Sequence, residues 1–282
     1  MESAQALWQA AEAVHALCYF DRTVRRAVRA AGAPGFWAGY FGTRLAPLRT
    51  DDPWLAGSVL YVFARPMIEQ HLPSVDDGAT WEAARRVSLR SVLRELGGEG
   101  APPAQAWAAA SEALRHVVEA GDTGARPLFA AHAGMGWPDD PWLATWWACT
   151  LLREYRGDGH LHVLAGEGLG GCEAFVLALR WRHHGDAADD SAASDRGWSD
   201  HSVATAYAHL RERGWVGDDR ELTADGRRAR VAIEAATDVR GVPAVVAEEQ
   251  VVAAVEALAP LADLALPLIP ARNPIGIAGG EA

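Results

Sequence analysis

Length, composition and charge exclude several classes of protein. The 282 residues are 50% hydrophobic and 22% charged, which is typical of a globular chain with one or two domains and not of a disordered or fibrous one. The formal net charge of −11 excludes a protein that is basic overall, so binding to nucleic acid would require a local basic face. No run of about 18 uncharged apolar residues is present, so we expect a cytoplasmic protein without a membrane span.

Residue usage adds two expectations. Every basic residue is Arg, and Asn occurs only at Asn273, a bias typical of a GC-rich bacterial genome. The cysteines at 18, 149 and 172 are widely spaced and lie in apolar segments, which favours buried thiols over disulfides or a zinc site. We therefore predict a bacterial protein without a structural metal, and the sequence specifies no cofactor.

The N-terminal segment, 1–35, is predicted to be helical. Apolar residues recur there at helical spacing, which predicts one long helix or a broken pair. His15 lies on the apolar face, where it is either a core histidine bonded to a carbonyl or a ligand-binding residue. An aromatic cluster follows at 36–41, which includes Trp37 and Tyr40 and either covers the core or lines a pocket.

A six-residue string, Asp-Asp-Pro-Trp-Leu-Ala, occurs at 51–56 and again at 139–144. Asp before Pro is typical of a helix start, because Asp caps the first turn and Pro has no N–H to lose at the first helical position. The apolar stretches that follow, 54–64 and 142–152, predict two helices buried on most sides. We therefore predict a tandem duplication, in which these two helices pack together at the centre of a pseudo-two-fold core.

Two further helices are predicted at 80–96 and 104–120. The first carries four arginines interleaved with glutamates, which we interpret as a solvated helix face: Arg85, Arg86, Arg90 and Arg94.

The densest polar chemistry follows the second string. Arg153, Arg156 and His160 are spaced by three and four residues, so they share one face if the helix continues that far. Arginine there can clamp a carboxylate or phosphate, and His160 can transfer protons. The alternative is a buried Arg–Glu–Asp network that only stabilises the fold, and Gly157 and Gly159 can interrupt the helix. The spacing alone does not decide between these interpretations.

The segment 198–228 has the pattern of the second half of a winged helix. A capped helix at 199–213 ends in Leu-x-x-x-Gly, a small β-wing is expected near 215–223, and a new helix begins at Thr223. These residues resemble the MarR-type winged-helix family, whose members carry Leu-x-x-x-Gly-Leu-Val followed by Leu-Thr-x-x-Gly.

More broadly, the chain resembles a bacterial helix-turn-helix family related to the MarR-type proteins. The resemblance covers most of the chain and implies a mainly α-helical fold. The matching motifs are His-Ala at 15–16, Tyr-Phe at 19–20, Arg-Pro-Leu-Phe-Ala-Ala at 126–131, Leu-Arg-Glu-x-Arg-Gly-Asp-Gly-His at 152–160 and Asn-Pro-Ile-Gly at 273–276.

Together, the repeat and the resemblance imply two tandem winged-helix-like halves that correspond to a fused MarR dimer. We expect four segments: an N-terminal helical segment at 1–35, a first, degenerate half at 36–125, a second half at 126–240, and a C-terminal helix and tail at 241–282.

Two functions are open at this point. The first is a pocket between the halves for a hydrophobic or aromatic metabolite, with catalysis if a histidine faces it. The second is a ligand-responsive DNA-binding regulator, which the wing at 217–221 disfavours because it has three carboxylates against one arginine. We expect a monomer or homodimer with no membrane partner. The expected pocket residues are His15, Trp37, Tyr40, Arg65, His132, Trp146, Trp147 and Arg156, with His160 and Arg153 as the catalytic pair.

Overall fold

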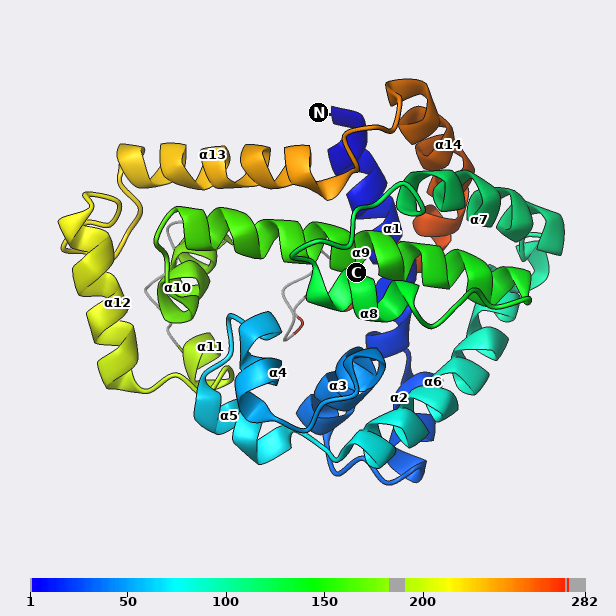
Figure 1. The fold of residues 1–282 in the computed structure, drawn as a ribbon, viewed down its shortest axis with the longest axis horizontal. Coiled ribbons are helices and arrows are strands. Elements are labelled where there is room, and N and C mark those ends of the chain that lie inside the picture. The colour runs from blue at the N-terminus through cyan, green and yellow to red at the C-terminus, as the bar shows by residue number, and fades with distance from the viewer. Residues whose placement is uncertain (1, 183–190, 272, 274–282) are drawn as a thin grey trace. The chain divides into compact units, whose positions relative to one another are not determined.

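The computed structural model describes residues 2–182, 191–271 and 273, and its elements are helices joined by short connections (Figure 1). The expected mainly α-helical class is confirmed. Of the Asn-Pro-Ile-Gly motif, residues 274–276 lie outside the described part of the chain. The α-helices are α1 (Glu2–Phe20), α2 (Arg22–Ala30), α3 (Phe36–Leu45), α4 (Pro53–Val59), α5 (Arg65–His71), α6 (Val75–Glu95), α7 (Ala104–Val118), α8 (Pro127–Ala133), α9 (Pro141–Gly166), α10 (Gly171–Arg182), α11 (Ser191–Ser194), α12 (Asp200–Glu212), α13 (Ala224–Gly241) and α14 (Glu248–Ala265), and the short 3-10 helices are η1 (Ala46–Leu48), η2 (Gly98–Gly100) and η3 (Leu266–Leu268).

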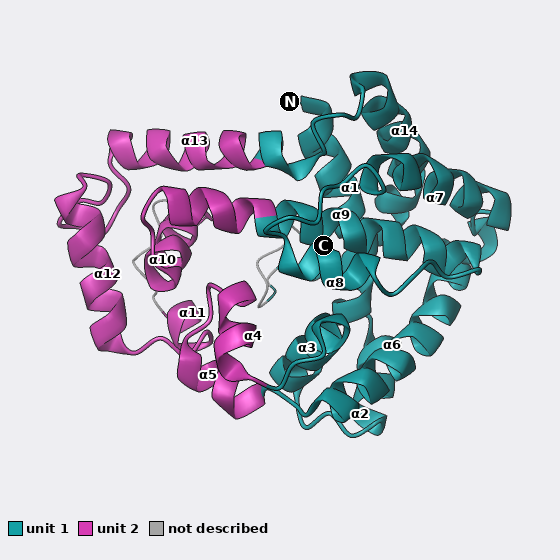
Figure 2. Ribbon diagram, in the orientation of Figure 1, with its two compact units in different colours: residues 1–51, 72–158, 238–282 teal, residues 52–71, 159–237 magenta. Residues whose placement is uncertain are grey.

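The chain divides into two compact units that are interleaved along the sequence (Figure 2). Helices α9 and α13 each begin in one unit and end in the other. The units therefore do not follow the four sequential segments expected from the repeat. Unit 1 comprises residues 1–51, 72–158 and 238–282, and unit 2 comprises residues 52–71 and 159–237.

The two Asp-Asp-Pro strings begin helices of different kinds. Both start as predicted, because Asp52 accepts a hydrogen bond from the Trp54 N–H at 2.8 Å and Asp140 accepts one from the Leu143 N–H at 3.1 Å. However, α4 has 7 residues and lies in unit 2, whereas α9 has 26 residues and begins in unit 1. Pro66 stands where the second copy has Glu154, and a proline there breaks a continuous helix, so the chain restarts as α5. These helices are therefore not the equivalent central pair that a tandem duplication predicts.

In unit 1, helix α1 packs against α14 and α2, and α14 also packs against α7. Within the described residues, the stretch Glu248–Leu268 is long and apolar enough to cross a membrane. A core helix meets the same criterion, and α14 buries Val251, Leu258 and Leu261 among its neighbours. Length and composition alone therefore do not make α14 a membrane span.

The candidate site is lined by residues of α1, α2, α3 and α6. The expected N-terminal helix is a broken pair, because Asp21 ends α1 and caps α2 through the N–H groups of Thr23 and Val24 at 2.7 and 3.1 Å. Helix α6 packs against both α2 and α3. Close approach of α3 to α6 requires Gly42, since a Cβ there would lie 2.6 Å from the Trp81 ring.

In unit 2, the segment expected to resemble a winged helix has its predicted helices. Ser199 caps α12 by accepting from the Ser202 N–H at 3.1 Å, and Gly214, with φ of +71°, follows the helix end. The expected β-wing is a hairpin with an isolated antiparallel bridge between Val216 and Leu222, and no longer strand forms in the described chain. A paired-strand wing is therefore not shown.

Candidate ligand site

A cavity of about 380 Å³ lies within unit 1, lined by residues of α1, α2, α3 and α6. Its lining combines two kinds of side chain. Aromatic and aliphatic residues form one part, and arginines form the other. The two parts come from sequence that is largely local, since α1, α2 and α3 follow one another along the chain.

Three aromatic residues, Tyr19, Phe36 and Tyr40, contribute to the cavity wall. The Tyr19 and Tyr40 ring centroids are 4.8 Å apart, and the rings of Phe36 and Tyr40 stack at 6.3 Å with an interplanar angle of 12°. The Tyr40 hydroxyl accepts a hydrogen bond from Arg44 at 3.1 Å. Tyr19 is only 4% exposed, and no hydrogen bond joins its hydroxyl to the described residues. A hydroxyl on the wall of a cavity can orient a bound ligand.

Helix α2 contributes four arginines to the cavity: Arg22, Arg25, Arg26 and Arg29. Their spacing of three, four and seven residues places them on one face of the helix, and all four are exposed. Arg25 lies over the Phe36 ring, with its guanidinium carbon 5.7 Å from the ring centroid. None of the four pairs with a carboxylate of the described residues. This part of an acidic protein is therefore locally positive.

Arg85 lines the cavity from α6 and is 1% exposed. The interpretation of this arginine as part of a solvated face is wrong, because α6 packs against α2 and α3 there. Its guanidinium pairs with Glu82 at 2.6 Å and donates to the Cys18 sulfur at 3.4 Å. The Arg85 Nε–H is buried and has no hydrogen-bond partner among the described residues. Glu82 also pairs with Arg86 at 2.8 Å, so one buried carboxylate serves two arginines.

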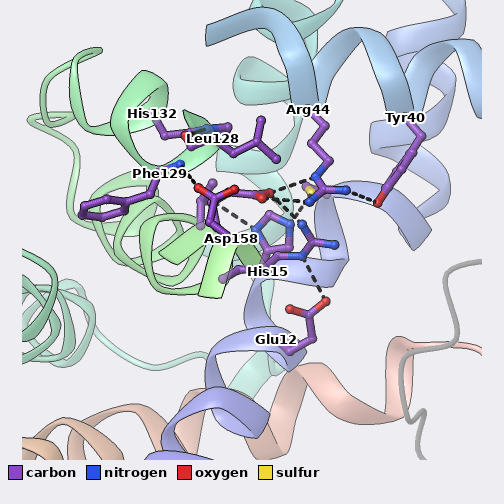
Figure 3. Close-up of polar contacts among 12 residues, drawn as sticks. Glu12, His15, Tyr40, Arg44, Leu128, Phe129, His132 and Asp158 are labelled. Carbon is purple, nitrogen blue, oxygen red and sulfur yellow. Dashed lines mark hydrogen bonds and ion pairs between the residues drawn. The ribbon is translucent and has the colours of Figure 1, made fainter. Parts of the chain in front are cut away.

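Beside Tyr40, four charged residues form a buried network (Figure 3). Arg44 binds Glu154 through both carboxylate oxygens at 3.1 and 2.9 Å. Arg153 binds Glu154 at 2.6 Å and Glu12 at 3.2 Å, so two arginines meet two carboxylates. Burial alone would raise the pKa of Glu154, but Arg44 and Arg153 outweigh burial and hold this pKa well below its usual range. For Arg153, the structure matches the buried-network alternative, and α9 continues through Gly157 and Gly159.

His15 is a buried core histidine that bonds to a side chain. Its Nδ1 lies 3.0 Å from the Thr150 hydroxyl, which itself donates to the Trp146 carbonyl at 2.9 Å. The hydroxyl therefore accepts from Nδ1–H, and Nε2 is the unprotonated nitrogen, 3.9 Å from the Cys18 sulfur. Burial, reinforced by Arg153 and Arg85, lowers the pKa of His15 well below its usual value. His15 is thus neutral, and it contacts the cavity wall through Cys18 and through the Tyr19 ring, whose centroid is 5.2 Å away.

The structure gathers several other expected pocket residues in the unit 1 core without placing them at the cavity. Trp146 and Trp147 are almost completely buried, and the His132 Nδ1 lies 2.8 Å from the Leu128 carbonyl. Trp37 packs on the neighbouring aromatic rings of α3. Arg156 pairs with Asp238 at 2.9 Å and lies over the Trp8 ring. Among the expected pocket residues, Tyr40 is the one that lines the described cavity.

Two expected site residues, Arg65 and His160, lie in unit 2. Arg65 pairs with Glu69 at 2.8 Å, and the His160 Nδ1 lies 2.8 Å from the Thr237 hydroxyl. Arg153 belongs to unit 1, so neither unit contains the catalytic pair of Arg153 and His160. Within the described residues, no group of three or more His, Cys, Asp or Glu side chains could hold a metal ion.

Asp158 was expected beside Arg153 and His160 or in a buried Arg–Glu–Asp network, and it is 2% exposed. One of its oxygens accepts from the Phe129 N–H at 3.0 Å, and within the part of the chain that the structure describes the other, Oδ1, has no hydrogen-bond partner. Burial raises the pKa of Asp158 to about 7. This carboxyl group therefore changes charge near neutral pH.

The arginines of α12 and of the following hairpin are paired inside unit 2. Arg211 pairs with Asp218 at 3.1 Å, and Arg213 pairs with Glu167 at 3.6 Å. Arg220 lies over the Tyr207 ring at 4.8 Å. The expected shortage of free positive charge on this surface therefore arises from pairing as well as from composition.

No curated protein and no solved structure matches the chain. A family model described as a helix-turn-helix family matches residues 4–267, which is nearly the whole chain. The protein therefore belongs to this helix-turn-helix family.

Proposed function

We propose that the protein binds a small organic molecule with an aromatic or apolar body in the cavity of unit 1. The observation that supports this most directly is the cavity itself, about 380 Å³ in volume and walled by Tyr19, Phe36 and Tyr40. Ligand sites typically measure about 300–1,000 Å³ and combine apolar walls with a few polar groups. The Tyr19 hydroxyl supplies such a group. The proposed ligand lies within unit 1. The pocket predicted from the sequence, in contrast, lay between two halves of the chain.

Binding without catalysis fits the titratable groups near the cavity. Burial raises the pKa of the Cys18 thiol to about 12, so this sulfur is not a thiolate at neutral pH. His15 is neutral, and its Nδ1 is occupied by Thr150. Neither group is tuned for proton transfer near pH 7.

The proposal is tested with N-phenyl-1-naphthylamine, a neutral aromatic probe whose fluorescence increases in apolar sites. We expect saturable binding to the wild-type protein and loss of binding in Val28→Phe, because Val28 lines the cavity and a larger ring would fill it. Ala33, in the connection between α2 and α3, also lines the cavity, and Ala33→Leu serves as a second variant that would fill it. Circular dichroism confirms that each variant is folded, and undiminished binding by both folded variants would contradict the proposal.

A second candidate function is ligand-responsive DNA binding through α12. Family membership supports it, and so does the exposed face of α12, which carries His201, Ala204 and Thr205. A MarR-like regulator of this kind would act in the bacterial cytoplasm. The pairing of Arg211 and Arg213 with carboxylates opposes strong phosphate binding.

The second candidate is tested by fluorescence anisotropy with the duplex upstream of the protein's own gene, at two salt concentrations. We expect weak, strongly salt-dependent binding that Arg211→Gln reduces further. Salt-independent DNA affinity, or affinity unaffected by the substitution, would exclude α12 arginine contacts as its basis.

A further inference from the structure

We infer that the ligand of the unit 1 cavity is an organic anion, whose aromatic or apolar body lies against Tyr19, Phe36 and Tyr40 and whose acidic group binds the arginines of α2. The acidic group is a carboxylate or a phosphate, since arginine binds both through the same paired N–H groups. This inference rests on the proposed function and specifies the chemical class of the ligand.

Charge provides the first argument. Helix α2 is nine residues long and carries four exposed arginines on one face with no carboxylate partner in the described chain. Like charges at spacings of three and four residues repel one another and destabilise a helix. The carboxylate nearest in sequence, Asp21, is occupied in capping the helix through Thr23 and Val24. A bound anion would relieve this repulsion.

Position provides the second argument. The arginines of α2 line the same cavity as the aromatic residues, so one ligand can reach both. Arg25 already lies over the Phe36 ring, which places a cation directly beside the aromatic wall.

Burial provides the third argument. Arg85 and Tyr19 line the cavity at 1% and 4% exposure, and no hydrogen bond joins the Tyr19 hydroxyl to the described residues. A hydroxyl donor and a buried cation on one cavity wall suit an anionic acceptor. A carboxylate or phosphate supplies acceptor oxygens for both groups.

The test compares two probes that share one body. Anilinonaphthalene-8-sulfonate and N-phenyl-1-naphthylamine differ by a sulfonate group, which here stands in for the acidic group of the ligand. We expect the anionic probe to bind roughly tenfold or more tightly, since the arginine contacts are charge-assisted. Arg25→Gln/Arg29→Gln should abolish this preference while leaving the neutral probe bound. Arg115→Gln, which removes an exposed arginine on α7 away from the cavity, is the control and should change neither affinity.

The outcomes separate the two proposals. Equal affinity for both probes, or a preference that survives the double substitution, would overturn the inference and leave the proposed function standing. Binding of neither probe would contradict the proposed function as well. Competition by 1-naphthyl phosphate or by 1-naphthoate would identify the preferred acidic group. Displacement of the anionic probe by duplex DNA, with no displacement by either naphthyl compound, would overturn the inference in favour of a nucleic-acid surface.

Discussion

The arginines of helices α2 and α12 differ in whether carboxylates pair with them. On α12 and in its hairpin, Arg211 and Arg213 are held by Asp218 and Glu167. On α2, four arginines line a cavity without a carboxylate partner among the described residues. The helix expected to contact DNA therefore has its positive charge neutralised, whereas a helix with no motif of its own has positive charge available. Local pairing, and not the net charge of −11, determines where this protein can bind an anion.

The largest expected effect comes from removing a carboxylate that neutralises buried arginines. Glu154→Gln leaves Arg44 without its ion pair and Arg153 with only Glu12. We expect unfolding in urea to show a loss of about 3 kcal/mol, as for other buried pairs that lose one partner. Glu119→Gln, which removes an exposed pair with Arg115, should cost less than about 1 kcal/mol. Equal losses in the two variants would show that burial of the network contributes nothing.

Asp158 is the converse case, a buried carboxyl group without an ion-pair partner among the described residues. Its pKa is about 7 in the folded protein, whereas the ordinary pKa of an exposed Asp is 3.8, so the folded state binds more protons between these two values. Its contribution to stability is therefore fully present below pH 3.8 and is lost as pH rises through 7. We expect Asp158→Asn, which keeps an acceptor for the Phe129 N–H, to be more stable than wild type by on the order of 2 kcal/mol at about pH 8 and by little at about pH 4. A difference that does not vary with pH would contradict this assignment.

One substitution can remove an ion pair from the surface of α12. Asp218→Asn removes the partner of Arg211, so we expect duplex DNA to bind several-fold more tightly and with a steeper dependence on salt. Anisotropy titration at two salt concentrations measures both changes. Asp122→Asn, in a loop of unit 1, makes the same change of charge away from this surface. Equal effects of Asp218→Asn and Asp122→Asn on DNA affinity would contradict the role given to the Arg211–Asp218 pair.

The smallest expected effect concerns the arginines of α2. Because Arg22 and Arg26 have no ion pair in the described chain, their replacement by Gln should change the free energy of unfolding by less than about 0.5 kcal/mol. The sign should be stabilising at low salt, where like-charge repulsion is strongest, and the effect should vanish at high salt. A clear destabilisation would mean that these arginines stabilise the fold.

Local chemistry explains which parts of the structure could be predicted from the sequence. Capping by Asp52, Asp140 and Ser199 depends on neighbouring residues, so the starts of α4, α9 and α12 could be predicted. Pro66 also indicated a helix break in the first copy, but the repeated string led us to expect equivalent helices in the two copies. The division into units could not be predicted, because it depends on contacts between residues far apart in the sequence.

The candidate site was harder to predict. Arg85 looks like a surface arginine in sequence, and only the packing of α6 against α2 and α3 buries it. Tyr40 was expected at a pocket, and the arginines of α2 were not, although their spacing of three, four and seven residues was visible. Their significance became clear only when the cavity showed that they lie beside an aromatic wall. The expected roles of Arg153 and His160 rested on a shared helix face, which does not determine which partners each side chain finds.

The most direct test of ligand binding in unit 1 is a crystal structure of the protein with 1-naphthyl phosphate. The account predicts density for the naphthyl ring against Phe36 and Tyr40, with the phosphate within hydrogen-bond distance of Arg25 or Arg29. A cavity filled by protein side chains, or a probe bound only elsewhere on the molecule, would contradict it.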